Sequence, residues 1–315
     1  MALLSHELFS RILTPDSARQ VIECHLDQRV TKIEDETFLG LGFDMTQFME
    51  LLRDRLWRSE NEIEFFLNDR KGRSKEAWSS AIQPSGVLTL DALMRLKAQK
   101  TSIYVHSIDR MVQPIRELVR DMTATGYFAA RVYAMYSPAN AHSTPKHVDP
   151  TDVIAMQLHG SKDWLIDTQP KIANLMPGTS MIQSSDGDFI EPAEYSIAPG
   201  EAMFIPRGFL HHAKSSNEDS LHLVVALQPL TWMDVMENIA KVWAEQQPEL
   251  RASVLAADTD GEIVSSFAAA AELFANSSDA QFVQETASSL MKERAQKRHV
   301  TEFGQLFAKA PDDLL

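Results

Sequence analysis

The short run Thr144-Pro-Lys-His147-Val-Asp149, near the middle of the chain, has residue types and a spacing that suit metal binding. In an extended segment the side chains of residues i and i+2 point to the same side, so His147 and Asp149 can both reach one ion. A His-x-Asp pair is common by chance. The pair therefore gains weight only if a further ligand lies elsewhere in the sequence.

A second pattern supplies that ligand. Gly200, an apolar run, Pro206 and Gly208 precede His211 in that order. This order predicts a turn, a strand, a tight turn and then a histidine that opens the next strand. The two patterns together offer two imidazoles and one carboxylate, the facial triad that holds Fe(II) and leaves coordination positions free. Structural zinc would need four protein ligands, and Cys24, the chain's one cysteine, does not provide them.

These side chains must be held by a β-rich core, which we place at residues 126–230. Short runs of β-forming residues alternate there with Pro and Gly, the pattern of a β-sandwich or barrel. The predicted strands are Tyr127–Ser137, Asp152–Leu158, Asp163–Asp167, Tyr195–Ile197, Ala202–Ile205 and Ser220–Leu227. The expected fold class is therefore α+β with a mostly β core.

Helical patterns flank this core. Residues 1–125 are expected to form a mostly helical region that packs on the core, with a helix start at Thr14-Pro15 and an amphipathic helix over Asp44–Trp57. Residues 231–315 are expected to be helical again, with a capping-box start at Thr231 and further helices at Glu262–Ala275 and Ala280–Gln296. The predicted domains are thus 1–125, 126–230 and 231–315.

The first helix after the core carries an apolar stripe. Such a stripe needs burial, either on the chain's own β core or against a second copy of the chain. We expect a homodimer through the residues after Thr231. The stripe consists of Val235, Met236, Ile239, Val242 and Trp243.

The charge balance excludes several kinds of partner. The 315 residues include 30 Lys and Arg against 44 Asp and Glu, a net charge of −14. This balance argues against a nucleic-acid or anionic-membrane footprint, which needs clustered Lys and Arg, and it is compatible with a basic partner. We find neither a charged leader before a long apolar run nor a segment apolar enough to span a bilayer, so we expect a cytoplasmic protein.

At its histidine motifs the chain resembles a known family. The segment from Gly200 to His211 is similar to the second cupin motif, with Ser215 where that motif often has Asn. The runs Thr144–Asp149, Gln157–Trp164 and Pro206–His211 resemble the JmjC-type, cupin-fold 2-oxoglutarate oxygenases, most of all their ribosomal-protein hydroxylase branch. The resemblance implies a double-stranded β-helix, Fe(II), 2-oxoglutarate and O2 as cosubstrates, and hydroxylation of a residue in a protein or peptide.

The resemblance also implies roles for individual residues. His147, Asp149 and His211 match the iron ligands of the family. The family's basic residue for the far carboxylate of 2-oxoglutarate lies fifteen positions after the first histidine, which is Lys162 in this sequence. His147, Asp149 and His211 would thus be catalytic, and Lys162 would bind the cosubstrate.

Two further cosubstrate contacts follow from the same resemblance. Thr144 matches a position that helps to hold the far carboxylate in the related asparaginyl hydroxylases. Tyr133 resembles a tyrosine with this role in the ribosomal branch, although Arg131 stands where that branch has Asn. Tyr136 is the alternative to Tyr133.

Neighbouring residues have plainer interpretations. His212 follows His211 directly, so on a strand it would point to the opposite face. His222 could line the pocket or pack in the core. We expect Arg207 to order the turn before His211, and Trp164 to belong to the core.

The leading hypothesis is thus an Fe(II)- and 2-oxoglutarate-dependent hydroxylase of a protein or peptide side chain. A hydroxylase of a small molecule or peptide natural product is the alternative with the same chemistry. A cupin dioxygenase or isomerase that does not use 2-oxoglutarate would not need the cation of Lys162. A non-catalytic cupin would not need His147, Asp149 and His211 together.

Overall fold

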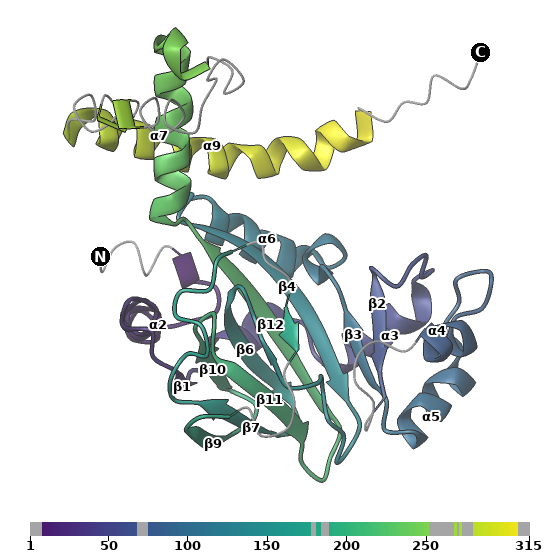
Figure 1. Ribbon diagram of the computed structural model, residues 1–315. Helices are drawn as coiled ribbons and strands as arrows, with labels where there is room; N and C mark the ends of the chain where they lie inside the picture. Colours follow the sequence, from purple (N-terminus) through teal and green to yellow (C-terminus); the bar gives the residue numbers. More distant parts are fainter. Residues whose placement is uncertain are drawn as a thin grey trace, which may run out of the picture. The chain divides into compact units, whose positions relative to one another are not determined.

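The computed structural model describes residues 8–67, 75–177, 181–183, 189–251, 268–269, 271–272 and 280–307. Figure 1 shows the order of its elements along the chain. The helices are α2 (Pro15–Asp27), α3 (Met45–Asp54), α4 (Lys75–Ala81), α5 (Leu90–Ala98), α6 (Gln113–Thr123), α7 (Trp232–Gln246) and α9 (Ala280–Phe307), with short 3-10 turns at Thr37–Leu41, Ile108–Arg110 and Pro248–Arg251. The strands are β1 (Thr31–Glu34), β2 (Ile63–Phe66), β3 (Ser102–Val105), β4 (Phe128–Ser137), β5 (His147–Val148), β6 (Asp152–His159), β7 (Lys162–Asp167), β8 (Ile182–Gln183), β9 (Pro192–Ile197), β10 (Glu201–Ile205), β11 (Leu210–Ser215) and β12 (Ser220–Pro229).

The helix starts that the sequence predicts are confirmed by their capping contacts. Thr14 caps α2 by accepting a hydrogen bond from the backbone N–H of Ser17. Asp44 and Thr231 each form a capping box at the start of α3 and α7. Helix α3 ends at Asp54, before the predicted end at Trp57. These caps satisfy backbone N–H groups that a helix leaves unpaired at its first turn.

Two mostly antiparallel sheets form the β core, as the predicted double-stranded β-helix requires. One has seven strands in the order β1-β10-β6-β12-β4-β3-β2, and the other has five in the order β8-β5-β11-β7-β9. Apolar side chains from both sheets meet between them. This cluster consists of Val153, Ala155, Met203 and Ile205 from the larger sheet, and Trp164, Ile166, Ile197 and Ala213 from the smaller one, together with Phe209. Burial of these side chains holds the two sheets together.

The N-terminal region contributes more than helices to the first sheet. Strand β1 pairs with β10 at one edge, and β2 and β3 extend the sheet beyond β4 at the other. The sequence pattern does not predict these three strands, because each is only four residues long. Short strands carry too few residues to show a clear alternation.

The chain divides into two compact units, one of residues 1–122 and 130–229, and one of residues 123–129 and 230–315. In the second unit, α7 packs on α9 and buries Val235, Ile239 and Trp243. The predicted helix at Glu262–Ala275 falls mostly outside the described residues, while the last helix, α9, extends past the predicted end at Gln296. Among the described helices, none has the length and apolar content needed to cross a membrane.

Candidate active site

Three side chains that the sequence singles out converge in the β core. His147 is the first residue of β5, Asp149 follows that strand, and His211 is the second residue of β11. Strands β5 and β11 pair so that His147 lies opposite His211. The Nε2 atoms of the two histidines lie 3.5 and 3.6 Å from Oδ2 of Asp149. One ligand atom from each residue lies within 4.8 Å of the others, the only such group of three in the described part of the chain.

Backbone carbonyls fix the orientation of both imidazoles. His147 donates from Nδ1 to the carbonyl of Pro145 over 2.7 Å, and His211 donates from Nδ1 to the carbonyl of Phe209 over 3.1 Å. A histidine that donates from Nδ1 keeps a lone pair on Nε2 when it is neutral. Both Nε2 atoms therefore face Asp149 in the form that binds a metal ion.

Burial and mutual charge shift the pKa values of the group. Burial, with the nearby charge of His147, lowers the pKa of His211 to about 4. Burial alone would lower the pKa of His147 and raise that of Asp149, but their mutual attraction reverses both directions. One half-buried carboxylate thus faces two imidazoles, of which His211 is neutral at pH 7. Such a set is suited to a divalent cation, which would bind all three.

His212 lies outside this group. It pairs with Leu165, and the centroid of its ring lies 4.7 Å from that of His142. Because neighbouring residues of a strand point to opposite faces, His212 points away from Asp149 when His211 points toward it. The geometry favours the ligand role for His211.

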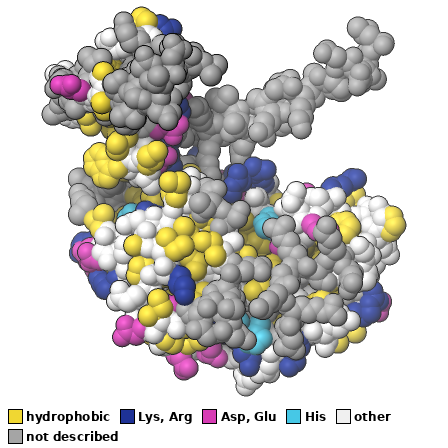
Figure 2. All heavy atoms as spheres, viewed as in Figure 1, with side chains coloured by type: hydrophobic (Ala, Val, Ile, Leu, Met, Phe, Trp, Pro, Cys, Tyr) yellow, Lys and Arg dark blue, Asp and Glu magenta, His cyan; other side chains and the backbone are white. Residues whose placement is uncertain are grey.

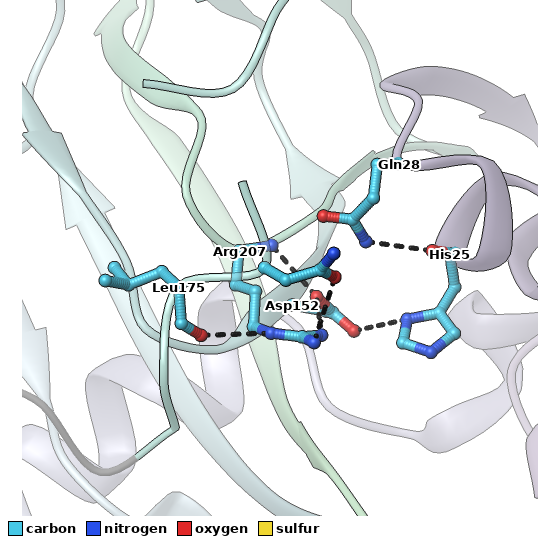
Figure 3. Close-up of polar contacts among 6 residues, drawn as sticks. His25, Gln28, Asp152, Leu175 and Arg207 are labelled. Carbon is cyan, nitrogen blue, oxygen red and sulfur yellow. Dashed lines mark hydrogen bonds and ion pairs between the residues drawn. The ribbon is translucent and has the colours of Figure 1, made fainter. Parts of the chain in front are cut away.

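A buried aspartate that the sequence reasoning did not identify joins the two ligand loops. Asp152 at the start of β6 is fully buried, and its Oδ1 accepts hydrogen bonds from the backbone N–H of Arg207 over 2.9 Å and from Nη1 of Arg207 over 3.4 Å. Its Oδ2 lies 2.6 Å from Nδ1 of His25 on α2 (Figure 3). Gly208 then donates its backbone N–H to the carbonyl of Asp149 over 3.0 Å. The turn before His211 is thereby tied to the loop that carries Asp149.

The side chain of Arg207 extends the same network. Its Nε donates to the carbonyl of Leu175 over 3.1 Å (Figure 3). Its Nη2 donates to the side-chain oxygen of Asn174 over 3.2 Å. The expectation that Arg207 orders the turn is confirmed by these bonds. No local sequence signal reveals the network, because Asp152 is 55 residues from Arg207 and 127 from His25.

A cavity of about 260 Å³ opens beside the three ligands. Thr144 lines it, and its Oγ1 lies 3.5 Å from Nδ1 of His147. Tyr133 also lines it, with its ring stacked on that of Tyr104 at 5.3 Å. Tyr136 instead donates from its hydroxyl to Asp219 over 2.8 Å, on the other face of β4. The geometry therefore favours Tyr133 over Tyr136 as a group that a ligand could contact. The lining comprises Glu64, Phe66, Tyr104, His106, Tyr133, Met135, Ser143, Thr144, His147, Asp149, Val153, Trp164, Met181, His211, Ala213, His222 and Val224.

Lys162 is buried next to this cavity. Its side chain is fully shielded from solvent, and its Nζ contacts Oγ of Ser137 at 3.2 Å and Nδ1 of His222 at 3.0 Å. Burial lowers the pKa of Lys162 well below its usual value. Its contacts in the described residues include no carboxylate. A buried lysine without an acidic partner is costly, which points to a bound anion as the missing partner.

Comparisons with known proteins agree with this architecture. Residues 110–235 match the family model of the JmjC domain. Human ribosomal oxygenase 1 is 31% identical over 106 residues, which cover 33% of this chain and 16% of that protein. The bifunctional lysine-specific demethylase and histidyl-hydroxylase NO66 of Culex quinquefasciatus is 22% identical over 270 residues, which cover 80% of this chain and 39% of that protein. The chain thus spans well under half the length of these curated relatives.

Solved structures show the same fold. The structure of ycfD from Escherichia coli superposes with a TM-score of 0.53 at 13% sequence identity, over 87% of this chain and 71% of that one. A second structure of this ribosomal oxygenase, in complex with cobalt and 2-oxoglutarate, gives a TM-score of 0.51 at 14% identity, over 87% of this chain and 70% of that one. At this level of identity the likeness establishes the fold.

Proposed function

We propose that this chain, which carries a JmjC domain at residues 110–235, is an Fe(II)- and 2-oxoglutarate-dependent oxygenase that hydroxylates a side chain in a protein or peptide. The observation that carries the proposal is the convergence of His147, Asp149 and His211 at a cavity whose neighbour is the buried amine of Lys162. The printed names of the relatives, a ribosomal oxygenase and a histidyl-hydroxylase, support it.

The donor set fits Fe(II). Two imidazole nitrogens and one carboxylate oxygen make the triad that leaves coordination positions free for a cosubstrate and O2. A structural zinc site would use four protein ligands, and the described residues bring three together. His147, Asp149 and His211 would hold the metal, and the carbonyls of Pro145 and Phe209 would keep the two imidazoles in the required orientation.

The surroundings of Lys162 fit 2-oxoglutarate. The far carboxylate of this dianion would supply the acidic partner that Lys162 lacks among the described residues. Thr144 and Tyr133 line the same cavity and could donate hydroxyl hydrogen bonds. A cupin that does not use 2-oxoglutarate has no need of this cation, so Lys162 disfavours that alternative.

The protein's own part in the reaction is to bind, orient and exclude water. Iron with 2-oxoglutarate and O2 supplies the oxidising chemistry when bound. His147 and His211 are nearly buried, at 7% and 4% exposure, and only the side chain of Asp149 among the three ligands is partly exposed, at 23%. Trp164, Val153 and Val224 add apolar surface to the cavity. This apolar lining would limit side reactions of the oxidant with water.

The substrate, the location and the oligomeric state belong to the same proposal. A net charge of −14 favours a basic protein or peptide as partner over nucleic acid or an anionic membrane. Charged side chains of both signs are scattered over the described part of the face in Figure 2. We propose a cytoplasmic location, because the free, buried thiol of Cys24 would stay reduced there.

For the homodimer, the stripe predicted from the sequence is partly used within the chain, since Val235, Ile239 and Trp243 are buried. Helix α7 nevertheless exposes Trp232, Met233 and Met236, at 76%, 59% and 53% of their surfaces. Hydrophobic side chains gather where α7 begins (Figure 2). We propose this exposed group as the dimer contact.

Turnover of 2-oxoglutarate tests the proposed activity. The purified chain, given 2-oxoglutarate, O2, Fe(II) and ascorbate, should form succinate, and the His211→Ala variant should not. Mass spectrometry of peptides from cells with and without the protein should then show a gain of one oxygen on the substrate. A modified small molecule in place of a modified peptide would support the alternative hydroxylase. Failure of the metal-loaded chain to bind 2-oxoglutarate would contradict the proposal.

A further inference from the structure

The anion-binding end of the cavity lies where the two sheets meet. Lys162 comes from β7 of the five-stranded sheet, whereas its two contacts, Ser137 and His222, come from β4 and β12 of the seven-stranded sheet. All three side chains are at most 2% exposed. The ammonium has three N–H groups, and these contacts use two of them. Lys162 therefore keeps one N–H for a ligand, too few for both oxygens of a carboxylate.

His222 has a second ring nitrogen, Nε2, which has no acceptor among the residues that the structure describes. When Lys162 is charged it donates to Nδ1 of His222 over 3.0 Å, so the ring proton must reside on Nε2. This Nε2 makes no hydrogen bond in the described part of the chain, although His222 is 2% exposed and lines the cavity. The contact with Lys162 thus sets a tautomer that offers an N–H group.

Trp164 offers another such group. Its indole Nε1 is buried and has no hydrogen-bond partner among the described residues. The ring of Trp164 lies 5.7 Å from that of His222, edge to face, and it lines the same cavity. A buried N–H that lacks an acceptor is costly, so the indole Nε1 of Trp164, beside the cavity-lining Nε2 of His222, calls for an explanation.

The strand register places Trp164 between the metal ligand His211 and Lys162. Along β7 and β11 the pairs run from Ile166–His211 through Trp164–Ala213 to Lys162–Ser215. His222 and Trp164 line the cavity, whereas Lys162 is not among its described lining residues. A ligand that extends from the metal toward Lys162 therefore meets these two rings first.

We propose that His222 and Trp164 are cosubstrate-binding residues that donate from Nε2 and Nε1 to the far carboxylate of 2-oxoglutarate, beside Lys162. The inference rests on the proposed function, in which 2-oxoglutarate is the cosubstrate. A carboxylate accepts up to about four hydrogen bonds, so two neutral donors and one ammonium match its capacity. The same donors would add little affinity for a ligand that ends in a methyl group, which accepts no hydrogen bond.

A pair of matched ligands tests the proposal without turnover. 2-Oxopentanoate has the chain length and the 2-oxo-carboxylate end of 2-oxoglutarate but a methyl group in place of the far carboxylate. Calorimetric titration of each acid into the Zn(II)-loaded chain gives two dissociation constants. The variant His222→Asn puts an amide oxygen near the place of Nδ1, to accept from Lys162, but replaces nothing at Nε2. Trp164→Phe removes the indole N–H and keeps an aromatic ring.

Each variant should raise the dissociation constant for 2-oxoglutarate by about tenfold or more, the scale of one charge-assisted hydrogen bond, and leave that for 2-oxopentanoate unchanged. The control is His159→Asn, which changes the same residue type as His222 at an exposed position. Zn(II) affinity and Tm report on the fold.

Three results would overturn the inference or its premise. A dissociation constant for 2-oxoglutarate that stays within about twofold of wild type in either variant would contradict the assignment. Equal weakening of both acids would show a structural role instead. A wild-type chain that binds neither acid would remove the proposed function itself, and the inference with it.

Discussion

His147 stands directly opposite His211 in the antiparallel pair of β5 and β11, with 4.2 Å between their ring centroids. Residues that face each other in such a pair have side chains on the same face of the sheet. Asp149 lies two residues beyond His147 and reaches both imidazoles from the end of β5. One strand pair and one adjoining residue therefore hold the whole triad, and the metal site depends on their register.

Loss of one ligand should abolish metal binding, and loss of its neighbour should not. We expect His211→Ala to weaken Fe(II) affinity by more than about a hundredfold and to stop succinate formation. Loss of a group that only hydrogen-bonds to a ligand typically weakens metal affinity by about 10- to 100-fold, and loss of the ligand itself should cost more. His212→Ala should keep both, because His212 points to the other face. Metal titration under nitrogen measures the first effect. Retained activity in His211→Ala together with its loss in His212→Ala would reverse the assignment.

The variant Lys162→Ala should keep the fold and the metal but lose affinity for 2-oxoglutarate. Removing a charge-assisted hydrogen bond of roughly 1.5–3 kcal/mol raises the half-saturating concentration by about tenfold or more. Lys214→Ala, which removes an exposed lysine from β11, is the matched control. Titration of 2-oxoglutarate against each metal-loaded variant gives the comparison. An unchanged half-saturation point in Lys162→Ala would place the lysine outside the site.

The affinity for 2-oxoglutarate should fall as pH rises. Burial lowers the pKa of Lys162 in the free chain, and a bound carboxylate would raise it, so binding takes up a proton. The groups that face Nζ are the hydroxyl of Ser137 and the imidazole of His222, whose own pKa is lowered by burial and by Lys162. Above the free-state pKa of Lys162 the affinity should drop by up to about tenfold per pH unit.

The control for this pH dependence is Lys162→Arg. A guanidinium stays charged throughout the accessible range, so its binding curve should lose the slope. Dissociation constants measured by calorimetry on the Zn(II)-loaded chain, over the pH range in which both proteins stay folded, give both slopes. Equal slopes for the two proteins would show that Lys162 does not take up the proton.

A methyl group at Gly208 should damage the turn before His211. Gly208 has φ of +91°, and a Cβ there would lie 1.9 Å from the carbonyl oxygen of Ile172. The substitution Gly208→Ala should therefore lower Tm by at least about 3 °C and weaken metal binding, since the turn is bonded to Asp149. Gly40→Ala, where a Cβ meets nothing within 4 Å, is the control. Equal Tm values for the two variants would contradict this reasoning.

The exposed start of α7 should mediate a homodimer. We expect light scattering at micromolar concentration to give twice the chain mass, and the double variant Trp232→Ser, Met236→Ser to give the monomer, because it removes apolar surface from the contact. Leu90→Ser, at another exposed apolar position, should stay dimeric. A monomeric wild-type chain would refute the dimer.

Local chemistry in the sequence was sufficient for much of the architecture and for the triad. The His-x-Asp spacing and the turn at Pro206–Gly208 are short-range features, since strand alternation and turn geometry depend on residues a few positions apart. The helix caps at Thr14, Asp44 and Thr231 are equally local. Each could be predicted because its physical cause lies within one segment.

Only the tertiary structure decided which distant residues meet. The contacts of Lys162 with His222, 60 residues away, and of Asp152 with His25, 127 residues away, depend on how strands and helices from separate segments pack. The periodicity of one segment says which face a residue occupies, but not which face of another segment lies across from it. Whether Nε2 of His222 and the indole N–H of Trp164 have partners among the described residues could therefore be judged only with the two sheets together, because hydrogen-bond satisfaction is a property of the packed core.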